Sequence, residues 1–294
     1  MYCTNGVRMR TSIECLPCIV RQAVDACKMV TDNNHDIATL LKEVLCKLSH
    51  ADLALTPPEI VQLVHILIQE KLNHPDPYCQ MKELSTLRAK SLAEDAQSSI
   101  NNTKFPFYSA VAFSIAANIL DFGMRSEWNE DVVVASFLQA ERKNCLDTAA
   151  ISQLYNEISS AKTVLVLGDN TGESVFDRIL IEHFPGHAKI FYAVKDSPII
   201  NDATVKEARD SDIHTVAEII SNGTNIPGTV IGKCSSEFIN IFTTADVVIS
   251  KGQGNFETLN ENLRKIWFLF QVKCPVIAQH YNYQVGDWLI IRNE

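Results

Sequence analysis

A strand, a sharp turn and a helix are predicted at residues 163–180, and this unit constrains the fold more than any other stretch. Residues 163–167 (TVLVL) form a short apolar run without alternation, which is typical of a strand buried on both faces of a parallel sheet. The run breaks at residues 168–173 (GDNTGE). An apolar helical face follows, made of Val175, Phe176, Ile179 and Leu180.

From residue 163 onward, apolar runs alternate with helical patterns, whereas the preceding half contains no convincing strand. Strands are predicted at 163–167, 189–194, 228–231, 246–250, 265–270, 275–279 and 288–291, and helices at 172–184, 202–210, 213–221 and 235–243. In the earlier half, helices are predicted near 12–26, 36–49, 57–72, 77–98, 105–123 and 145–160. The helix at 57–72 begins with a Thr-Pro-Pro-Glu cap. The alternation predicts an α/β fold with a mostly parallel sheet covered on both faces.

The formal charge of −9 argues against a general nucleic-acid binder or a binder of anionic membranes. No apolar stretch approaches the roughly 18 residues of a membrane span, and no signal-peptide core opens the sequence. Nine scattered cysteines fit reduced thiols better than a disulfide framework. We therefore expect a cytoplasmic protein.

Oxygen-bearing side chains follow two neighbouring strands. Asp169 and Asn170 come directly after the strand at 163–167, and Asp202 follows the strand at 189–194. Ligands of open α/β sheets bind beyond the carboxyl ends of the strands, and such oxygen donors suit Mg²⁺ or Mn²⁺. Helix capping is the competing interpretation of these Asp and Asn residues.

A third strand end carries residues 251–257 (KGQGNFE). The positive charge of Lys251 and the N–H groups of Gly252 and Gly254 would suit a phosphate. The loop matches neither the P-loop nor the dinucleotide pattern. Metal donors at two strand ends and an anion loop at a third indicate phosphoryl transfer.

Cys15 and Cys18 are the only cysteines spaced as a pair, in the first turn of a predicted helix. No second pair follows to complete a zinc site, and no strand precedes them as in a thioredoxin-like redox motif. Two small buried side chains are the favoured interpretation, with metal or redox chemistry as the alternative.

Asn118 and Asp121 stand three residues apart on a predicted helix, which by itself indicates only a solvent-facing pair. They belong, however, to one of six motifs that together resemble the metal-dependent damage-control phosphatase family, formerly a domain of unknown function, in its CxxC-bearing microbial branch. These motifs lie, in order, at residues 15–18 (CLPC), 76–78 (DPY), 117–123 (ANILDFG), 168–173 (GDNTGE), 198–204 (PIINDAT) and 251–257 (KGQGNFE).

The resemblance implies a helical N-terminal region, residues 1–145, packed on a three-layer α/β/α domain, residues 146–294. It implies a Mg²⁺, Mn²⁺, Co²⁺ or Ni²⁺ ion held by Asp169, Asn170 and Asp202. Family members hydrolyse phosphate esters of small metabolites, including sugar phosphates and damaged cofactor precursors. Residues expected to bind the substrate phosphate are Glu173, Lys251, Gly252, Gln253, Gly254 and Asn255.

The expected reaction is hydrolysis of a small phosphorylated metabolite, with Asp169, Lys251, Asn118 and Asp121 as candidate catalytic residues. Whether Asp169 attacks phosphorus or only binds the metal stays open, as does the oligomeric state. Thr171 stands where a haloacid-dehalogenase-type site needs a second Asp. The remaining alternatives are an S-adenosylmethionine-dependent carboxyl methyltransferase and a non-enzymatic metal- or nucleotide-sensing module.

Overall fold

The sheet lies at the centre of the molecule. The computed structural model describes residues 9–120 and 146–293. Within them the sheet has six strands in the order β3-β2-β1-β4-β5-β6. Every neighbouring pair is parallel except β5 with β6. The strands are β1 (Thr163–Leu167), β2 (Lys189–Val194), β3 (Glu218–Ser221), β4 (Val247–Lys251), β5 (Trp267–Gln271) and β6 (Trp288–Arg292).

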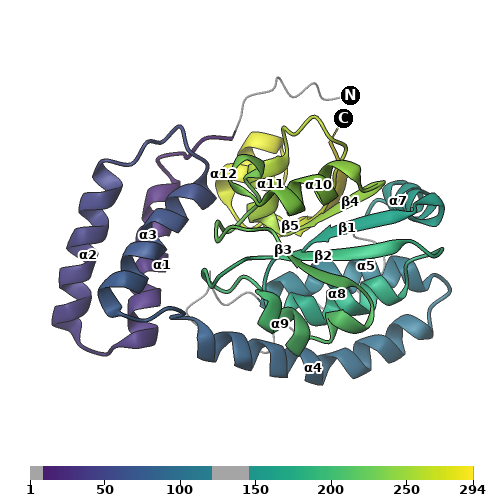
Figure 1. Cartoon of the computed structure of the whole chain (residues 1–294), viewed down its shortest axis with the longest axis horizontal. Coiled ribbons are helices and arrows are strands. Elements are labelled where there is room, and N and C mark those ends of the chain that lie inside the picture. Colours follow the sequence, from purple (N-terminus) through teal and green to yellow (C-terminus); the bar gives the residue numbers. More distant parts are fainter. Residues whose placement is uncertain (1–8, 121–145, 294) are drawn as a thin grey trace.

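Helices cover both faces of the sheet, which confirms the predicted three-layer α/β/α architecture (Figure 1). In the C-terminal half they are α7 (Thr148–Ser160), α8 (Glu173–Glu182), α9 (Val205–Asp210), α10 (Ser236–Thr244), α11 (Gln253–Leu259) and α12 (Pro275–Tyr281). Helices α10, α11 and α12 lie on one face, and α8 and α9 lie on the other. Since the strand order reverses between β1 and β4, a crevice forms at their carboxyl ends.

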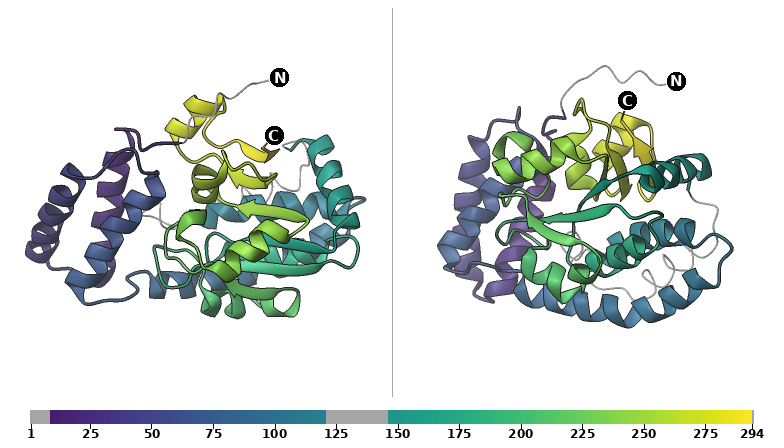
Figure 2. Two further views of the ribbon diagram at one scale, coloured as in Figure 1. Left: turned by 45° about the horizontal axis from the view of Figure 1, so that its top comes forward. Right: turned by 45° about the vertical axis from the view of Figure 1, so that its right-hand side comes forward.

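The N-terminal helices divide into two groups (Figures 1 and 2). Helices α1 (Cys15–Val30), α2 (Asn34–Ser49) and α3 (Pro57–Leu72) form a small bundle with its own core beside the sheet. Helices α4 (Cys79–Asn101) and α5 (Pro106–Ala116) pack against α8 on the sheet's lower face, and α5 continues into η1 (Ala117–Leu120). The boundary at residue 145 stays a prediction because it lies outside the described residues.

Two helix starts follow from local sequence. Thr56 and Glu59 form the predicted capping box that begins α3, with the Thr56 backbone N–H donating to Glu59 Oε2 at 2.9 Å. A second capping box, between Thr204 and Glu207, begins α9 immediately after the loop that carries Asp202. The start of α9 therefore limits how far that loop can shift.

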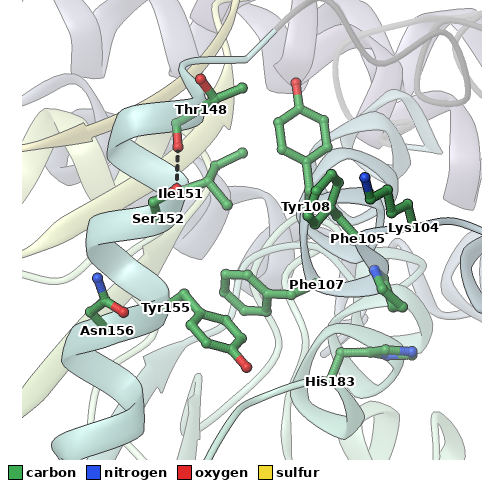
Figure 3. A pocket seen from close by; sticks show the side chains of 11 residues that line it. Lys104, Phe105, Phe107, Tyr108, Thr148, Ile151, Ser152, Tyr155, Asn156 and His183 are labelled. Atoms are coloured by element: carbon green, nitrogen blue, oxygen red, sulfur yellow. Dashed lines mark hydrogen bonds between the residues drawn. The ribbon is translucent and has the colours of Figure 1, made fainter.

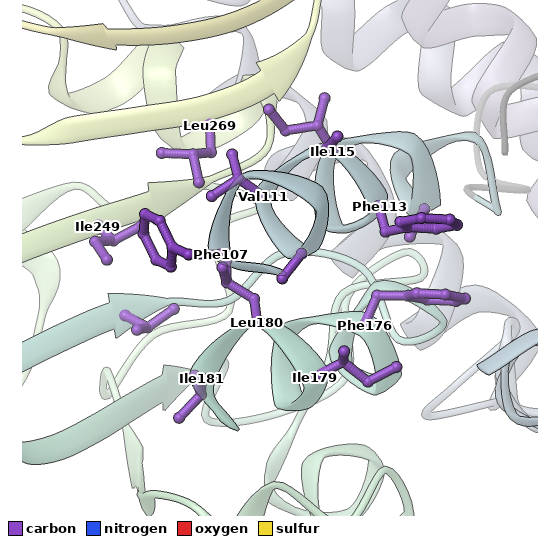
Figure 4. Packing of buried hydrophobic residues seen from close by; sticks show 14 of the residues in the cluster. Phe107, Val111, Phe113, Ile115, Phe176, Ile179, Leu180, Ile181, Ile249 and Leu269 are labelled. Carbon is purple, nitrogen blue, oxygen red and sulfur yellow. The ribbon is translucent and has the colours of Figure 1, made fainter. Parts of the chain in front are cut away.

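Helix α5 is buried on all sides, between α8 and the sheet (Figure 4). Its Val111 and Ile115 lie beside Ile249 of β4 and Leu269 of β5 in one apolar cluster. Complete burial of such a side chain stabilises the fold by roughly 1.5–3 kcal/mol. Although α5 is strongly apolar, no helix in the described parts of the chain has both the length and the apolar character to cross a membrane.

Three sequence predictions were wrong. Residues 213–221 form a short turn of helix and then β3 instead of one helix, and residues 228–231 form a loop instead of a strand. Residues 275–279 are not a strand but part of α12, since Pro275 occupies a helical first turn and Asn282 ends the helix at φ 58°. A short apolar run is compatible with both a strand and a helix. Residues 218–221 form a strand because they pair with β2.

A histidine is buried in the N-terminal bundle. His65 on α3 is 2% exposed, its ring centre lies 5.8 Å from that of Tyr78, and its Nε2 is buried without a hydrogen-bond partner. Burial lowers the pKa of His65 to about 4.

Acid should therefore weaken the fold through His65. The unfolded chain takes up this proton near pH 6.5 and the folded chain only near pH 4, so stability falls as the pH drops between these values. The free energy of unfolding should fall by roughly 2 kcal/mol between pH 7 and pH 5 through this residue. Urea titrations should show a correspondingly smaller pH dependence for His65→Leu, whereas the same substitution at exposed His35 should keep the wild-type dependence.

Candidate functional site

The first site residues follow β1. Gly168 leaves no room for a side chain, because a Cβ there would lie 2.7 Å from the Tyr192 hydroxyl oxygen. The chain then presents Asp169 and Asn170, both buried, before α8 begins at Glu173. The turn therefore directs Asp169 and Asn170 into the crevice, whereas Glu173 is fully buried.

Two amide groups hold the acidic side chains of this turn. Asn170 Nδ2 donates to Asp169 Oδ2 at 3.0 Å and to Glu173 Oε1 at 2.9 Å. Asn118, which follows α5, donates to the same Glu173 oxygen and reaches Asp169 Oδ2 at 3.5 Å. Its Oδ1 is buried without a hydrogen-bond partner. Asn118 thus joins the site, whereas Asp121 lies outside the described residues.

Asp202 joins this group from the loop after β2. Asn170 and Asp202 form an isolated β-bridge, and the Ala203 N–H donates to the Asp169 carbonyl at 2.9 Å. Ile200 precedes them at φ 36°, a conformation that costs a β-branched residue about 1–3 kcal/mol. The structure thereby brings Asp169, Asn170 and Asp202 together, and their role as metal ligands stays a prediction.

Lys195 is the buried cation beside Asp202. Its Nζ lies 3.5 Å from Asp202 Oδ2 and donates to the Gly228 carbonyl at 2.5 Å. Only a small part of either side chain reaches solvent. The ion pair joins the two ends of the loop after β2, and the hydrogen bond to Gly228 holds this loop against the segment that leads toward β4.

Lys251, expected at the phosphate, lies completely buried beneath the site. Its Nζ donates to Asp177 Oδ1 at 2.6 Å, to Ser114 carbonyl oxygen at 3.2 Å and to Glu173 Oε2 at 3.3 Å. Burial alone would lower the pKa of Lys251, but the two carboxylates raise it above its ordinary value. Burial also raises the pKa of Glu173, against the effect of Lys251. The ammonium group therefore joins β4, α8 and α5.

In the rest of the predicted phosphate loop, some residues bind other parts of the protein and others line the cleft. The Gly252 N–H donates to the Leu269 carbonyl, so it is already used in the sheet. Fully buried Asn255 donates to the Gly168 and Lys251 carbonyls and accepts from the Thr229 hydroxyl. Gln253 and Gly254, by contrast, line the cleft.

The cleft has a volume of about 500 Å³ and lies between the sheet and the N-terminal bundle. Asp169, Asn170 and Asp202 form part of its wall, which is completed by Pro227 and the segment at 273–276. Helices α1 and α3 supply the opposite wall, with Cys15, Cys18, Ile19, Pro57, Pro58 and Val61. The prediction that both cysteines are buried was wrong, because Cys15 is only half-buried and Cys18 is exposed.

Sequence reasoning missed several residues of this region. Asp177 lies one helical turn after Glu173, and an acid on an otherwise buried helix was the available signal. Lys273 and Glu257 also line the cleft: Lys273 belongs to no recognised metal or phosphate pattern, and Glu257 ends the motif at 251–257 but was given no role. Among the described residues, no three His, Cys, Asp or Glu side chains form a metal-binding group. An ion at this site would therefore need the amide of Asn170 as well as carboxylates.

A second cavity, of about 650 Å³, lies at the beginning of α5 (Figure 3). Its described lining contains no acidic side chain and consists of Lys104, Phe105, Pro106, Phe107, Tyr108, Thr148, Ile151, Ser152, Tyr155, Asn156 and His183. Lacking carboxylates, this aromatic cavity does not suit a hard cation.

Replacing Lys251 by Met should destabilise the protein, because Glu173 and Asp177 would remain buried without their counter-ion. The expected loss in the free energy of unfolding is about 3–5 kcal/mol at pH 7.5. Urea unfolding of the wild type and the variant at pH 7.5 measures it.

Lys90→Met is the matched control, because Lys90 forms an exposed ion pair with Asp212 and should contribute at most about 1 kcal/mol. Wild-type stability of the Lys251 variant would contradict the structural role of this residue.

Comparison with known proteins extends over nearly the whole chain. Residues 11–289 match the damage-control phosphatase ARMT1-like domain. A damage-control phosphatase from Pyrococcus horikoshii is 32% identical over 292 residues, which span 97% of this chain and 99% of that protein. A damage-control phosphatase from Archaeoglobus fulgidus is 29% identical over 287 residues, 95% of this chain and 98% of its own.

The fold agrees with these matches. The crystal structure of a DUF89 family protein from Pyrococcus horikoshii is similar with a TM-score of 0.88 and 29% identity, covering 97% of this chain and 100% of that one. The resemblance seen in six sequence motifs is thereby confirmed. The protein belongs to the damage-control phosphatase ARMT1-like domain family.

Proposed function

We propose that this protein is a metal-dependent phosphatase that hydrolyses phosphomonoesters of small metabolites. Its family and the names of its relatives support a phosphatase with a role in metabolite repair. The observation that carries the proposal is the meeting of Asp169, Asn170 and Asp202 at one wall of a cleft large enough for a small metabolite.

The donor set fits a hard divalent cation such as Mg²⁺, Mn²⁺, Co²⁺ or Ni²⁺. Asp169 and Asp202 supply carboxylates, and Asn170 supplies an amide whose oxygen replaces its nitrogen after a half-turn of the side-chain amide. Gly252 makes room for the Asp169 carboxylate itself, since a Cβ there would lie 1.9 Å from Asp169 Oδ2. Such a cation would neutralise phosphate charge and polarise the phosphorus toward attack by water.

The chain's own residues would hold the phosphate from the opposite side. Of the described residues that line the cleft, Lys273 alone is a cation, and its charge also acts on Glu173. We assign Lys273 and Gly254 to the phosphate because they line the cleft, whereas the Gln253 amide already binds Glu257 and the Lys273 backbone. Lys251 and Asn255 then act as positioning residues, because their polar atoms already bind the protein.

Asn118 and Glu173 would position Asp169. The Asn118 amide lies within reach of both acids, and Glu173 in turn accepts from Lys251. This chain of contacts fixes the side chain of Asp169 before any ligand enters. A fixed donor avoids the reorganisation that a mobile one requires during the reaction.

Phosphate release should depend on a divalent ion and on Asp169. With a panel of sugar phosphates, chelator should abolish release, and Asp169→Ala should lower it at least about 100-fold. Asp210→Asn, which changes an exposed acid on α9, should leave the rate unchanged. A folded wild type that binds metal but releases no phosphate with any of the four ions would contradict the proposal and favour the methyltransferase or sensor alternative.

A methyl group at position 252 should impair metal binding. In Gly252→Ala the new Cβ would displace the Asp169 carboxylate, and the backbone φ of +78° adds strain. Calorimetric titration with Mn²⁺ should show affinity about 10–100-fold weaker than wild type. Gly232→Ala is the control, because a Cβ there meets nothing within 4 Å. Equal affinity in both variants would place the metal elsewhere.

A further inference from the structure

Glu257 on α11 is a buried acid that the proposed metal and phosphate contacts do not use. Its side chain lines the cleft that contains Asp169, Asn170 and Asp202, yet is only 9% exposed. It belongs to the sequence motif at residues 251–257, but no role in the site follows from that motif.

The orientation of Glu257 is fixed by a short chain of hydrogen bonds. The Lys273 backbone N–H donates to Gln253 Oε1 at 2.9 Å, so the NH₂ group of that amide faces away from Lys273. Gln253 Nε2 then donates to Glu257 Oε1 at 2.7 Å. One carboxyl oxygen is thereby held, and Glu257 remains at the cleft in a defined position.

The surroundings of Glu257 disfavour its charged form. In the described part of the chain, no Lys, Arg or His forms an ion pair with it, and burial raises its pKa to about 7 despite the Gln253 hydrogen bond. A carboxyl group that holds its proton near neutral pH suits general acid catalysis.

The other titratable groups near Glu257 come from α1 and from the segment around α12. Cys15 and Cys18 face it from α1, and Cys274 and Tyr281 face it from the start and end of α12. Burial raises the pKa of Cys15 to about 11 and also raises those of the other three, so all four are neutral at pH 7. These four neutral side chains therefore provide no positive charge that would stabilise the carboxylate form of Glu257.

Apart from Asp169, Asp202 and Glu257 itself, the charged residues in the described lining of the cleft are Lys273 and Glu14. Lys273 directs its backbone N–H to Gln253, and its charge acts on Glu173. Glu14 lies at the beginning of α1. Helix α3 contributes Pro57, Pro58 and Val61, which do not titrate.

We propose that Glu257 is the catalytic acid that protonates the leaving-group oxygen, an inference that rests on the proposed phosphatase function. With the phosphate between the metal donors and Lys273, the organic part of the substrate lies toward α1 and Glu257. Water forms the new P–O bond while the ester P–O bond breaks, and its electron pair stays on the leaving oxygen. That oxygen takes the Glu257 proton to give the free alcohol. The attacking water's proton leaves with the phosphate or to solvent, and Glu257 regains its proton from solvent.

The same arrangement assigns a role to the CxxC motif. Cys15 and Cys18 form the wall near Glu257 as neutral, weakly polar side chains. They limit the water that reaches the carboxyl group, which helps to keep it protonated. Neither redox chemistry nor metal binding at the cysteines is needed for this role.

The test compares two substrates in wild type and Glu257→Gln. An alkyl phosphomonoester needs a proton on its leaving oxygen, whereas 4-nitrophenyl phosphate has a leaving group that is stable as an anion. We expect kcat/KM to fall about 100–1,000-fold for the alkyl ester and less than about 10-fold for the nitrophenyl ester. The ratio of the two rates is measured on one sample, so it does not depend on the folded fraction.

The pH profile gives a second readout. Wild-type kcat/KM for the alkyl ester should decline above about pH 7 as Glu257 loses its proton, and this decline should be absent in Glu257→Gln. Glu237→Gln, at an exposed position on α10, should retain both the ratio and the profile. Mn²⁺ affinity measured by calorimetry should be unchanged in Glu257→Gln.

The outcomes separate this inference from the function on which it rests. Absence of metal-dependent release from either ester by wild type would overturn the phosphatase proposal itself. If wild type is active but Glu257→Gln lowers both rates equally, Glu257 is not the acid. An unchanged alkyl rate in the variant would overturn the assignment in the same way.

Discussion

The site depends on one buried cation. Lys251 is completely enclosed and donates to Asp177, Glu173 and the Ser114 carbonyl, which come from α8 and α5. A buried charge needs such partners because its desolvation is costly, and the partners in turn need the charge. The end of β4, the first turns of α8 and the end of α5 therefore have a fixed relation. Asp169, Asn170 and Asn118 are positioned by these three elements.

Topology explains why the chemistry gathers at this place. The strand order reverses between β1 and β4, so the chain leaves these neighbouring strands in different directions and opens a crevice. Polar residues after β1 and β2 meet at this crevice through the bridge between Asn170 and Asp202. Helices α1 and α3 of the bundle then supply the opposite wall, so the crevice at the carboxyl ends of the strands becomes a cleft. The bundle thus forms part of the cleft wall.

The sequence predicted the central elements because their signals are local. The strands at 163–167 and 189–194 and the Thr56 capping box were found where expected. Predictions failed for short apolar runs such as 213–221 and 275–279, since periodicity over a few residues does not separate strand from helix. There the outcome followed from pairing with β2 and from Pro275 in a helical first turn. Asp121 and the residue-145 boundary lie outside the described residues.

The sequence by itself determined the fold class, the family and the set of oxygen donors that follow the strands, because each is written in contiguous motifs. Only the tertiary structure decided which side chains face the cleft. Lys251 points beneath the site because α5, more than a hundred residues earlier, brings Ser114 over it. Lys273 and Glu257 enter the cleft wall, and Cys15 lies near Glu257 because α1 packs beside α3 and α3 contacts α11. Burial and charge pairing depend on such distant neighbours, and no local pattern specifies them.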